Sequence, residues 1–210
     1  MVPGHWKQLS MTLKYKKYLD ELSSRHPKFK KLIEIVGPIN RRPGFRTLND
    51  AVFYAIVGQM LSVHAARSII KRLKDRFITS ENVIRWAMKN QPEVGLTMGL
   101  SRNKMRALGE WGRFVKKNKD VAIYWRKLPF KEYKNDVIKI WGLGSWSADM
   151  IAIFHFGKMD VWPHTDAGIQ RACRLMFGTS DYKKIGKFVN GCETVACLYL
   201  WEMLDKKIVL

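Results

Sequence analysis

Hydrophobic residues recur at every third or fourth position along nearly the whole chain, which is the spacing of amphipathic helices. The pattern contains no sustained alternation of apolar and polar residues between hairpin turns, as strands would show. Pro27 is suited to the first turn of a helix, and Gly37 is suited to end it. Between them, Phe29, Leu32 and Val36 fall on one face. The sequence therefore predicts an all-α protein of about nine or ten short helices joined by short loops.

The other predicted helices follow residues that favour helix caps, or coincide with apolar runs. Ser62 and Ser101 each precede a periodic segment, where a hydroxyl can accept hydrogen bonds from the first free N–H groups. Ser80 begins another such segment. These helices are predicted to span about residues 49–61, 63–77, 80–89, 102–117, 131–140, 147–156, 167–177 and 193–204.

The composition indicates a folded protein with an anionic partner. The chain has 210 residues and is 47% hydrophobic, so it can bury a core and fits one domain or two small ones. Lys and Arg number 38 and Asp and Glu 18, a formal net charge of +20. Residues 1–46 contain eleven basic and three acidic side chains interleaved with apolar positions, which places the charge on helices rather than on a tail. A solvated surface explains isolated lysines, but a total this large favours nucleic acid first and an anionic membrane second.

Several classes of protein are disfavoured. The longest apolar stretch, residues 51–63, is too short to span a bilayer, and the first residues lack the apolar core of a signal peptide. Cys173, Cys192 and Cys197 form no CxxC pair, which argues against a disulfide framework and favours a reducing compartment. The five histidines show no zinc-ligand spacing. We therefore expect no membrane association and a cytoplasmic, nucleoid-associated location, or a nuclear one in a eukaryote.

The segment from Ile140 to Ala148 joins two predicted helices through the pattern Gly142-Leu-Gly144. Glycines let the backbone turn tightly and leave amide N–H groups uncovered. The following helix adds its own free N–H groups and the positive end of its dipole, so the turn can bind an anion such as a DNA phosphate. A plain tight turn between helices is the alternative, which two glycines alone leave open.

The hairpin continues into a longer segment, GLGSWSADMIAIFHFGKMDVWPHTDAGIQRA, that resembles the helix-hairpin-helix and Gly/Pro/Asp signature of DNA base-excision glycosylases. HPKFKKLIEIVGP, FYAIVGQMLSVHAARSI and GLSRNKMRAL resemble the 3-methyladenine DNA glycosylase II (AlkA-like) family, the alkylation-repair branch. The resemblance covers about residues 25–205. It implies the helix-hairpin-helix DNA glycosylase fold, with two helical subdomains and the active-site cleft between them. One subdomain would combine residues 1–47 and 157–210, and the other would be residues 48–156, with the hairpin at about 132–156.

The resemblance assigns Asp166 as the catalytic residue. Base excision breaks a C1′–N bond through a sugar with oxocarbenium character, and a nearby carboxylate can stabilise that cation and orient or deprotonate water. Without the resemblance, an Asp before an apolar helix is most simply an N-cap, and the two roles can coexist. Asp149 and Asp160 are competing carboxylates, which we interpret as structural or positioning groups.

Bifunctional members of the superfamily carry a lysine near the hairpin that attacks C1′ as a Schiff-base nucleophile. This chain has Trp146 at that position, so the resemblance implies a monofunctional enzyme with water as the nucleophile and no lyase step. The resemblance also places Trp146 in the pocket for the flipped base, where its ring can stack on a positively charged base, and we add Trp162 and Tyr54 to that pocket. A core position that anchors the hairpin is the alternative for Trp146.

Base flipping leaves a gap in the duplex, which glycosylases fill with a wedge side chain. The resemblance places the wedge in Gln59-Met60-Leu61, and Met60 is the predicted residue. The alternative is that Met60 and Leu61 are core residues of an apolar helix. The residues predicted to contact DNA are Gln59, Met60, Leu61, Ser62, Gly142, Gly144, Ser145 and Ser147.

We expect no cofactor. Three cysteines cannot supply the four-cysteine iron–sulfur loop of some relatives. The backbone carbonyls of the family hairpin often hold a monovalent cation, which can apply here. The branch usually carries a Trp/Pro/Tyr/Arg cluster before its last helix, and the corresponding KFVNGCETVACLYLW keeps the Ala-x-Leu-Tyr-Leu-Trp end but lacks the arginine. The substrate is therefore the least determined feature.

Together these features predict a monomeric hydrolase of N-glycosyl bonds that acts on double-stranded DNA in base excision repair. Its expected substrates are damaged, alkylated purines of the 3-methyladenine type. The first alternative is the same fold acting on uracil, hypoxanthine or another deaminated or mismatched base. The alternative from another class is a non-catalytic helix-hairpin-helix DNA-binding module, which needs neither Asp166 nor a tryptophan-rich cleft.

Overall fold

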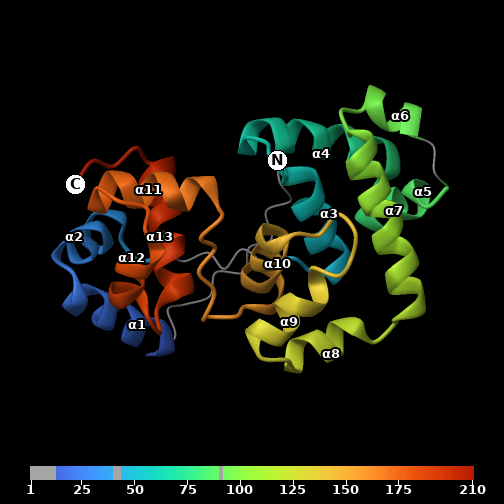
Figure 1. The fold of residues 1–210 in the computed structure, drawn as a ribbon. Coiled ribbons are helices and arrows are strands. Elements are labelled where there is room, and N and C mark those ends of the chain that lie inside the picture. Colours follow the sequence, from blue (N-terminus) through green and yellow to red (C-terminus); the bar gives the residue numbers. More distant parts are fainter. Residues whose placement is uncertain (1–12, 40–43, 90–91) are drawn as a thin grey trace. The chain divides into compact units, whose positions relative to one another are not determined.

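The computed structural model describes residues 13–39, 44–89 and 92–210, and this part of the chain folds into helices and loops without strands (Figure 1). The predicted all-α class is confirmed. The helices in chain order are α1 (Leu13–Arg25), α2 (Pro27–Val36), α3 (Leu48–Gly58), α4 (Val63–Phe77), α5 (Ser80–Ala87), α6 (Pro92–Thr97), α7 (Arg102–Lys117), α8 (Val121–Lys127), α9 (Phe130–Val137), α10 (Ser145–Ile151), the π-helix η1 (Ala152–Phe156), α11 (Ala167–Phe177), α12 (Tyr182–Val189) and α13 (Glu193–Asp205).

Within the described residues there are thirteen α-helices, more than the nine or ten predicted. The sequence pattern misses α1, α6, α8 and α12. Three of these have only six to eight residues, so they show barely two turns of periodicity and depend on packing rather than on propensity. α1 is longer, but its many charged residues obscure the apolar positions Leu19 and Leu22, which are buried.

Local capping residues determine the helix ends on which the site depends. α2 spans Pro27–Val36, as predicted. Ser62 caps α4, where its Oγ accepts a hydrogen bond from the Ala65 N–H at 3.2 Å. The preceding helix α3 ends at Gly58 rather than at the predicted residue 61. Residues 59–61 therefore form a turn between α3 and α4 instead of a last helical turn.

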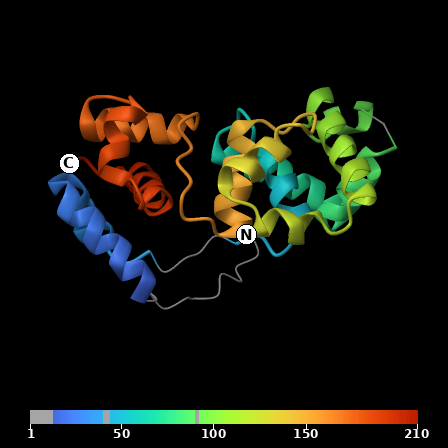
Figure 2. The same ribbon diagram turned by 60° about the horizontal axis from the view of Figure 1, so that its bottom comes forward.

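The chain divides into two compact units, which we call unit 1 and unit 2. Unit 1 comprises the described residues of Phe45–Phe156, and unit 2 comprises those of His5–Gly44 and Gly157–Leu210. In Figure 2 the blue N-terminal helices and the orange-to-red C-terminal helices both belong to unit 2. This unit is thus built from segments at opposite ends of the sequence.

Each unit is organised around one strongly apolar helix. In unit 1, α3 is buried on nearly all sides and packs against α4, α5, α7 and α10. In unit 2, α13 is buried along most of its length and packs against α2 and α11. A helix that is apolar all round must be covered on every side, which explains the central positions of both. Within the described part of the chain, no helix is long and apolar enough to cross a membrane.

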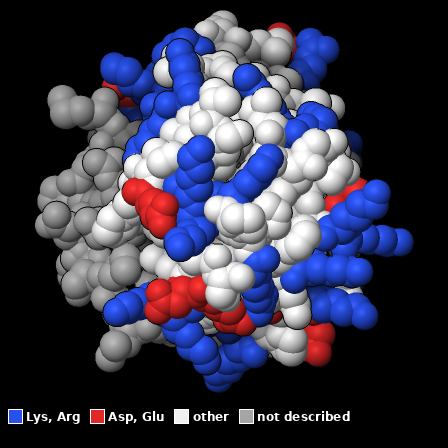
Figure 3. All heavy atoms as spheres, turned by 90° about the vertical axis from the view of Figure 1, so that its left-hand side faces the viewer, with Lys and Arg blue, Asp and Glu red and all other residues white. Residues whose placement is uncertain are grey.

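The helices of unit 2 carry many exposed basic side chains. Examples are Lys30 and Lys31 on α2 and Lys183 and Lys184 on α12. Figure 3 views the side of the molecule on which α1, α2, α11 and α12 lie in Figure 1, and Lys and Arg are spread over it among uncharged surface, with fewer Asp and Glu. Positive charge in this unit therefore lies on folded helices.

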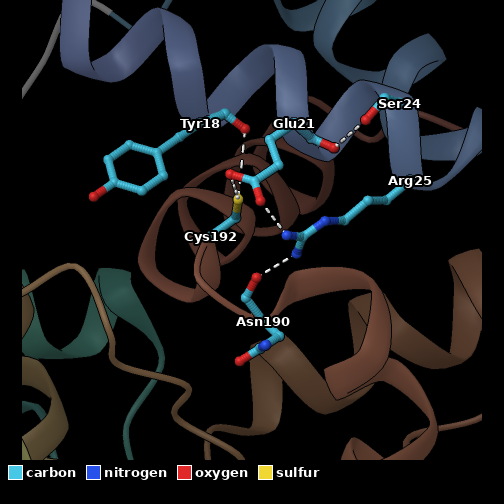
Figure 4. Close-up of polar contacts among 6 residues, drawn as sticks. All are labelled: Tyr18, Glu21, Ser24, Arg25, Asn190 and Cys192. Atoms are coloured by element: carbon cyan, nitrogen blue, oxygen red, sulfur yellow. Dashed lines mark hydrogen bonds and ion pairs between the residues drawn. The ribbon is translucent and has the colours of Figure 1, made fainter.

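Polar contacts fasten α1 to the loop between α12 and α13 (Figure 4). The Arg25 guanidinium donates to the Glu21 carboxylate and to the carbonyl oxygen of Asn190. The Cys192 thiol lies 3.7 Å from the carbonyl oxygen of Tyr18 and 3.7 Å from the Glu21 carboxylate. Burial, together with the negative charge of Glu21, raises the pKa of Cys192 to about 11. The thiol stays protonated at neutral pH and serves packing and hydrogen bonding.

Candidate DNA-binding and excision site

The predicted hairpin joins α9 to α10 within unit 1 and turns at Gly142. This residue has a φ of +85°, a left-handed conformation that glycine adopts at little cost. A Cβ atom at this position would lie 2.3 Å from the Cβ of Ala107 on α7. The positive φ and the close approach both require glycine, so Gly142 shapes the turn.

Gly144 has a different role, because it precedes α10 in an extended conformation (φ −97°, ψ −175°) that any residue can adopt. A Cβ atom here would meet nothing within 4 Å. As the N-cap residue it contributes no side-chain hydrogen bond to the first N–H groups of α10, which begin at the half-buried Ser145. The exposed tip of the hairpin therefore leaves room for an anion to approach these N–H groups.

Gln59 joins the end of α3 to the hairpin. Its Nε2 donates to the carbonyl oxygen of Gly142 at 2.8 Å and to the Oγ of Ser147 at 2.9 Å. Ser147 is 1% exposed, so its hydroxyl faces Gln59 rather than solvent. The two DNA-binding segments predicted from the sequence are thus held together by one amide.

Lys104 on α7 holds the same end of α3 from the other direction. Its Nζ donates to the carbonyl oxygens of Val57 at 2.8 Å and of Gln59 at 2.9 Å. Carbonyl groups at a helix C-terminus lack partners within the helix, and a cation suits them. Burial lowers the pKa of Lys104, as expected for an ammonium group placed among backbone atoms. This lysine fixes the backbone from which the next residue projects.

Met60 projects from the turn between α3 and α4. Its side chain is fully exposed, and its φ of +57° is uncommon for a residue other than glycine. Leu61 is also exposed, as is Ser62, which caps α4. Neither Met60 nor Leu61 is a core residue, so the apolar-helix alternative does not hold for them. An exposed apolar side chain on a fixed, left-handed turn has the geometry that a wedge needs.

Two of the predicted base-pocket residues lie in unit 1. Trp146 is half-buried on α10, and a Cβ atom at Gly58 would be 3.6 Å from its Cη2. Tyr54 lies one helical turn before Gly58, on the same side of α3. The ring centroid of Tyr54 is 4.9 Å from that of Phe45, and the Nζ of Lys74 lies 5.1 Å from it. Both predicted pocket residues are supported by packing yet keep part of their surface accessible.

Asp149, one of the competing carboxylates, is fully buried in unit 1. The Nζ of Lys134 donates to its Oδ1 at 2.7 Å and so ties α10 to α9. The hydroxyl of Tyr133 donates to the carbonyl oxygen of Ala148 at 3.0 Å, and burial together with the charge of Asp149 raises the pKa of Tyr133 well above its usual value. Among the described residues no three His, Cys, Asp or Glu side chains gather as metal ligands would. Asp149 is therefore a structural partner of a lysine.

Asp166 begins α11 in unit 2 and is half-buried. Its Oδ1 accepts a hydrogen bond from the Ile169 N–H at 2.8 Å, so it caps the helix. The same oxygen accepts a second hydrogen bond from the Nε1 of Trp201 at 3.1 Å. A Cβ atom at Gly168 would come within 3.0 Å of this oxygen, so glycine leaves room for the carboxylate. Two donors from different helices thus fix the orientation of one charged group.

Trp162 and Asp160 lie in the loop that leads to Asp166. Trp162 packs against the core of unit 2, and its buried indole N–H has no hydrogen-bond partner within the described residues. The carbonyl oxygen of Trp162 accepts from the His164 N–H at 2.9 Å, and that of His164 accepts from the Gln170 side chain at 2.9 Å. Asp160 is exposed at the surface of the same unit. The loop is therefore fixed before it reaches Asp166.

Comparison with known proteins shows related sequences and folds, although no family model matches the chain. The sequence is 25% identical over 202 residues to the alkylbase DNA glycosidase-like protein mag2 of Schizosaccharomyces pombe, a match that covers 90% of this chain and 93% of that protein. The fold is similar to that of the 3-methyladenine DNA glycosylase Mag1 of S. pombe, solved in complex with abasic DNA, with a TM-score of 0.79 and 23% identity over 90% of this chain and 97% of the other. It is also similar to the DNA-3-methyladenine glycosidase of Bacillus halodurans, with a TM-score of 0.72 and 23% identity over 89% of this chain and 88% of the other.

The expected resemblance to alkylation-repair DNA glycosylases is confirmed in sequence by mag2, and the two similar structures confirm the expected fold. The chain shares the all-α fold of these glycosylases. Sequence reasoning missed two residues that hold the predicted ones: Lys104, which holds the end of α3 in unit 1, and Trp201, which holds Asp166 in unit 2. Lys104 was included only as part of the segment GLSRNKMRAL, and Trp201 only as the end of the retained Ala-x-Leu-Tyr-Leu-Trp motif. The retained tryptophan of that motif is a sequence signal that could have suggested a contact with Asp166.

Proposed function

We propose that the protein is a monofunctional DNA glycosylase that flips a damaged base out of duplex DNA and releases it by hydrolysis. Alkylated purines of the 3-methyladenine type are the proposed substrates. The observation that carries the proposal is the fixed carboxylate of Asp166, which accepts hydrogen bonds from Ile169 and Trp201 at the position that the resemblance assigns to the catalytic residue. The similarity to mag2, an alkylbase DNA glycosidase-like protein, and to Mag1, a 3-methyladenine DNA glycosylase, supports the substrate class.

The chemistry needs one negative charge beside the sugar. As the C1′–N bond breaks, its electron pair leaves with the base and positive charge develops on the deoxyribose ring. Asp166 stabilises this charge and accepts a proton from the water that adds to C1′. A base that already carries a positive charge leaves as a neutral molecule, and an electron-rich ring such as Trp146 can stack on it beforehand. Because Trp146 stands where bifunctional members have a lysine, no Schiff base forms and the strand stays intact.

Duplex DNA binds through unit 1 in this proposal. The N–H groups at the hairpin tip, around Gly144 and Ser145, receive a phosphate, and Met60 fills the gap left by the flipped base. The side chain of Ser147 is buried and holds Gln59, so it supports the interface instead of contacting DNA. The net charge of +20 adds affinity that is independent of sequence and falls steeply as salt rises.

A lesion panel tests the proposal. Purified protein is incubated with methylated DNA and with duplexes that carry a single uracil or hypoxanthine, and strands are resolved before and after alkali. We expect release of 3-methyladenine, strand breaks only after alkali, and no covalent complex after borohydride reduction. Release of uracil or hypoxanthine without release of 3-methyladenine would show that the substrates are deaminated bases rather than alkylated purines. Binding of methylated duplex without release of any base would identify a DNA-binding module, and a trapped Schiff base would overturn the monofunctional mechanism.

A further inference from the structure

Unit 2 contains a concave surface that is lined by none of the residues assigned to excision. We call it the α12 groove; it has a volume of about 690 Å³, within the range of ligand-binding clefts. Its floor is apolar and is formed by Met176 and Phe177 at the end of α11 together with Ile185 and Phe188 on α12. Met176 and Ile185 are buried beneath the floor, and the half-buried rings of Phe177 and Phe188 supply its accessible apolar surface.

The aromatic rings of the floor pack against one another. Phe177 and Phe188 are stacked with centroids 6.1 Å apart, and the His26 ring stands edge-on to both, at 5.0 Å and 4.8 Å. Stacking of a nucleobase needs an open ring face. Because the phenylalanine rings of this floor face each other, the floor is better suited to contact with an inserted apolar side chain than to stacking of a nucleobase.

The rim of the groove is cationic. Lys183, Lys184 and Lys187 are exposed on α12, and Lys28 at the start of α2 donates to the carbonyl oxygen of Met176 at 2.6 Å. No Asp or Glu belongs to the described residues that line the groove. The face of the molecule in Figure 3 shows the same excess of Lys and Arg over acidic groups.

His26 contributes no charge to this rim at neutral pH. Burial and the neighbouring charge of Lys28 lower the pKa of His26, and its Nδ1 accepts a hydrogen bond from the Lys28 N–H at 3.2 Å. The positive potential of the groove therefore comes from lysines alone. Arginine, the residue most suited to bidentate recognition of phosphate, is absent from the described lining residues.

We propose that the α12 groove binds an acidic peptide segment of a partner protein, which inserts one or two apolar side chains into the floor and places its carboxylates against the lysine rim. Charge complementarity selects an anionic occupant, and the apolar floor selects one that carries hydrophobic side chains between its charges. The apolar group that duplex DNA exposes in its major groove is the thymine methyl, which is much smaller than a Leu or Phe side chain. The proposal is independent of the excision activity, because the groove shares no residue with that site.

Fluorescence anisotropy with defined probes tests the groove. The first probe is a short fluorescein-labelled peptide in which Asp and Glu flank one Phe and one Leu, and the second has Ser in place of both apolar residues. The third is a labelled single-stranded oligonucleotide. We expect the full-length protein to bind the first peptide at least about tenfold more tightly than the second, because only the first fills the floor. Equal affinity for the two peptides would show that only the positive charge of the surface attracts them, and it would overturn the proposal.

Charge-reversal variants localise the binding. Lys183→Glu combined with Lys187→Glu changes two exposed rim residues, and Lys30→Glu combined with Lys31→Glu makes the same charge change at exposed positions outside the groove. We expect the rim variant to weaken peptide binding about tenfold and the control variant to weaken it less than about threefold. Equal losses in the two variants would contradict the proposal. The opposite result is also defined. If the oligonucleotide binds the wild type more tightly than the peptide does, and only the rim variant loses affinity for it, the groove is a nucleic-acid site and the proposal is wrong.

Discussion

Unit 1 and unit 2 use buried polar contacts for different purposes. In unit 1 the side chains of Lys104 and Gln59 act on backbone atoms, and they fix a turn that leaves Met60 fully exposed. In unit 2 the contacts converge on one side chain, the carboxylate of Asp166, which Trp201 holds from another helix. In the proposed function this contrast separates two tasks: a surface for DNA needs a shaped backbone, whereas bond breaking needs one charge held in place.

Two of the carboxylates that follow the hairpin turn, Asp149 and Asp166, make the same contrast. Asp149 is fully buried and paired with Lys134, so its charge is neutralised inside unit 1. Asp166 is half-buried and accepts hydrogen bonds from two N–H donors, neither of which carries a charge. The printed contacts of Asp149 thus include a lysine ammonium, whereas those of Asp166 are a backbone N–H and an indole N–H. Residue type alone cannot distinguish these two environments.

The largest effect is expected from Asp166→Asn, which keeps the size of the side chain and removes its charge. The rate of base release should fall about 10²–10⁴-fold, because the oxocarbenium-like state loses its counter-ion and water loses its base. The matched control is Asp160→Asn, an exposed carboxylate in the same unit, which should release base at nearly the wild-type rate. Near-full activity of Asp166→Asn would show that Asp166 is not the catalytic carboxylate.

Asp149→Asn should act on stability instead. Removing the charge leaves the partly exposed Lys134 ammonium beside a neutral amide, and we expect the free energy of unfolding to fall by about 2–4 kcal/mol in urea denaturation. Asp136→Asn breaks a more exposed pair with Lys139 and should cost less than about 1 kcal/mol. A stable Asp149→Asn variant that releases no base would assign the catalytic role to Asp149.

Trp201→Phe removes the N–H that Trp201 donates to Asp166 and keeps an aromatic ring. The single-turnover rate of base release should fall about tenfold, while affinity for abasic duplex and the melting temperature change little, because the ring still fills its place. Trp86→Phe, in unit 1, is the control for the loss of an indole. A loss of DNA affinity equal to the loss of rate would show that Trp201 acts on binding rather than on the carboxylate.

Met60→Ala should give the smallest change. The free energy of unfolding should stay within about 0.5 kcal/mol of the wild type, because the side chain is fully exposed. Base release should slow several-fold, since the flipped state loses its plug, and Val63→Ala at another exposed apolar position should leave release unchanged. Unchanged release by Met60→Ala would move the wedge to another residue of the turn.

Features set by neighbouring residues could be predicted from the sequence. α2 and the cap of α4 match their predictions because Pro27 and Ser62 act on the turn that follows them. The cap at Asp166 is likewise local, since the carboxylate reaches the N–H of Ile169, three residues on. Such local signals predict the hairpin turn and the cap at Asp166, whereas the catalytic assignment of Asp166 comes from the family resemblance.

Contacts between distant segments could not be predicted. Lys104 reaches Gln59 across 45 residues, Gln59 reaches Ser147 across 88, and Trp201 reaches Asp166 across 35. Each depends on how helices pack, which one sequence does not encode in any local pattern. The same limit applies to Met60, whose exposure follows from the early end of α3 at Gly58.

The proposal that the hairpin binds DNA and that Asp166 performs the chemistry can be tested in one experiment. The single-turnover rate of 3-methyladenine release is measured as a function of protein concentration for Gly144→Val and for Asp166→Asn. Valine fits the extended backbone and open space at 144, so this variant should fold, bind duplex about tenfold more weakly, and reach nearly the wild-type rate at saturation.

Asp166→Asn should saturate at the wild-type concentration or below it and remain slow at every concentration. We expect this separation of binding from chemistry. A Gly144→Val variant that stays slow at saturation, or an Asp166→Asn variant whose rate recovers when protein is added, would contradict it.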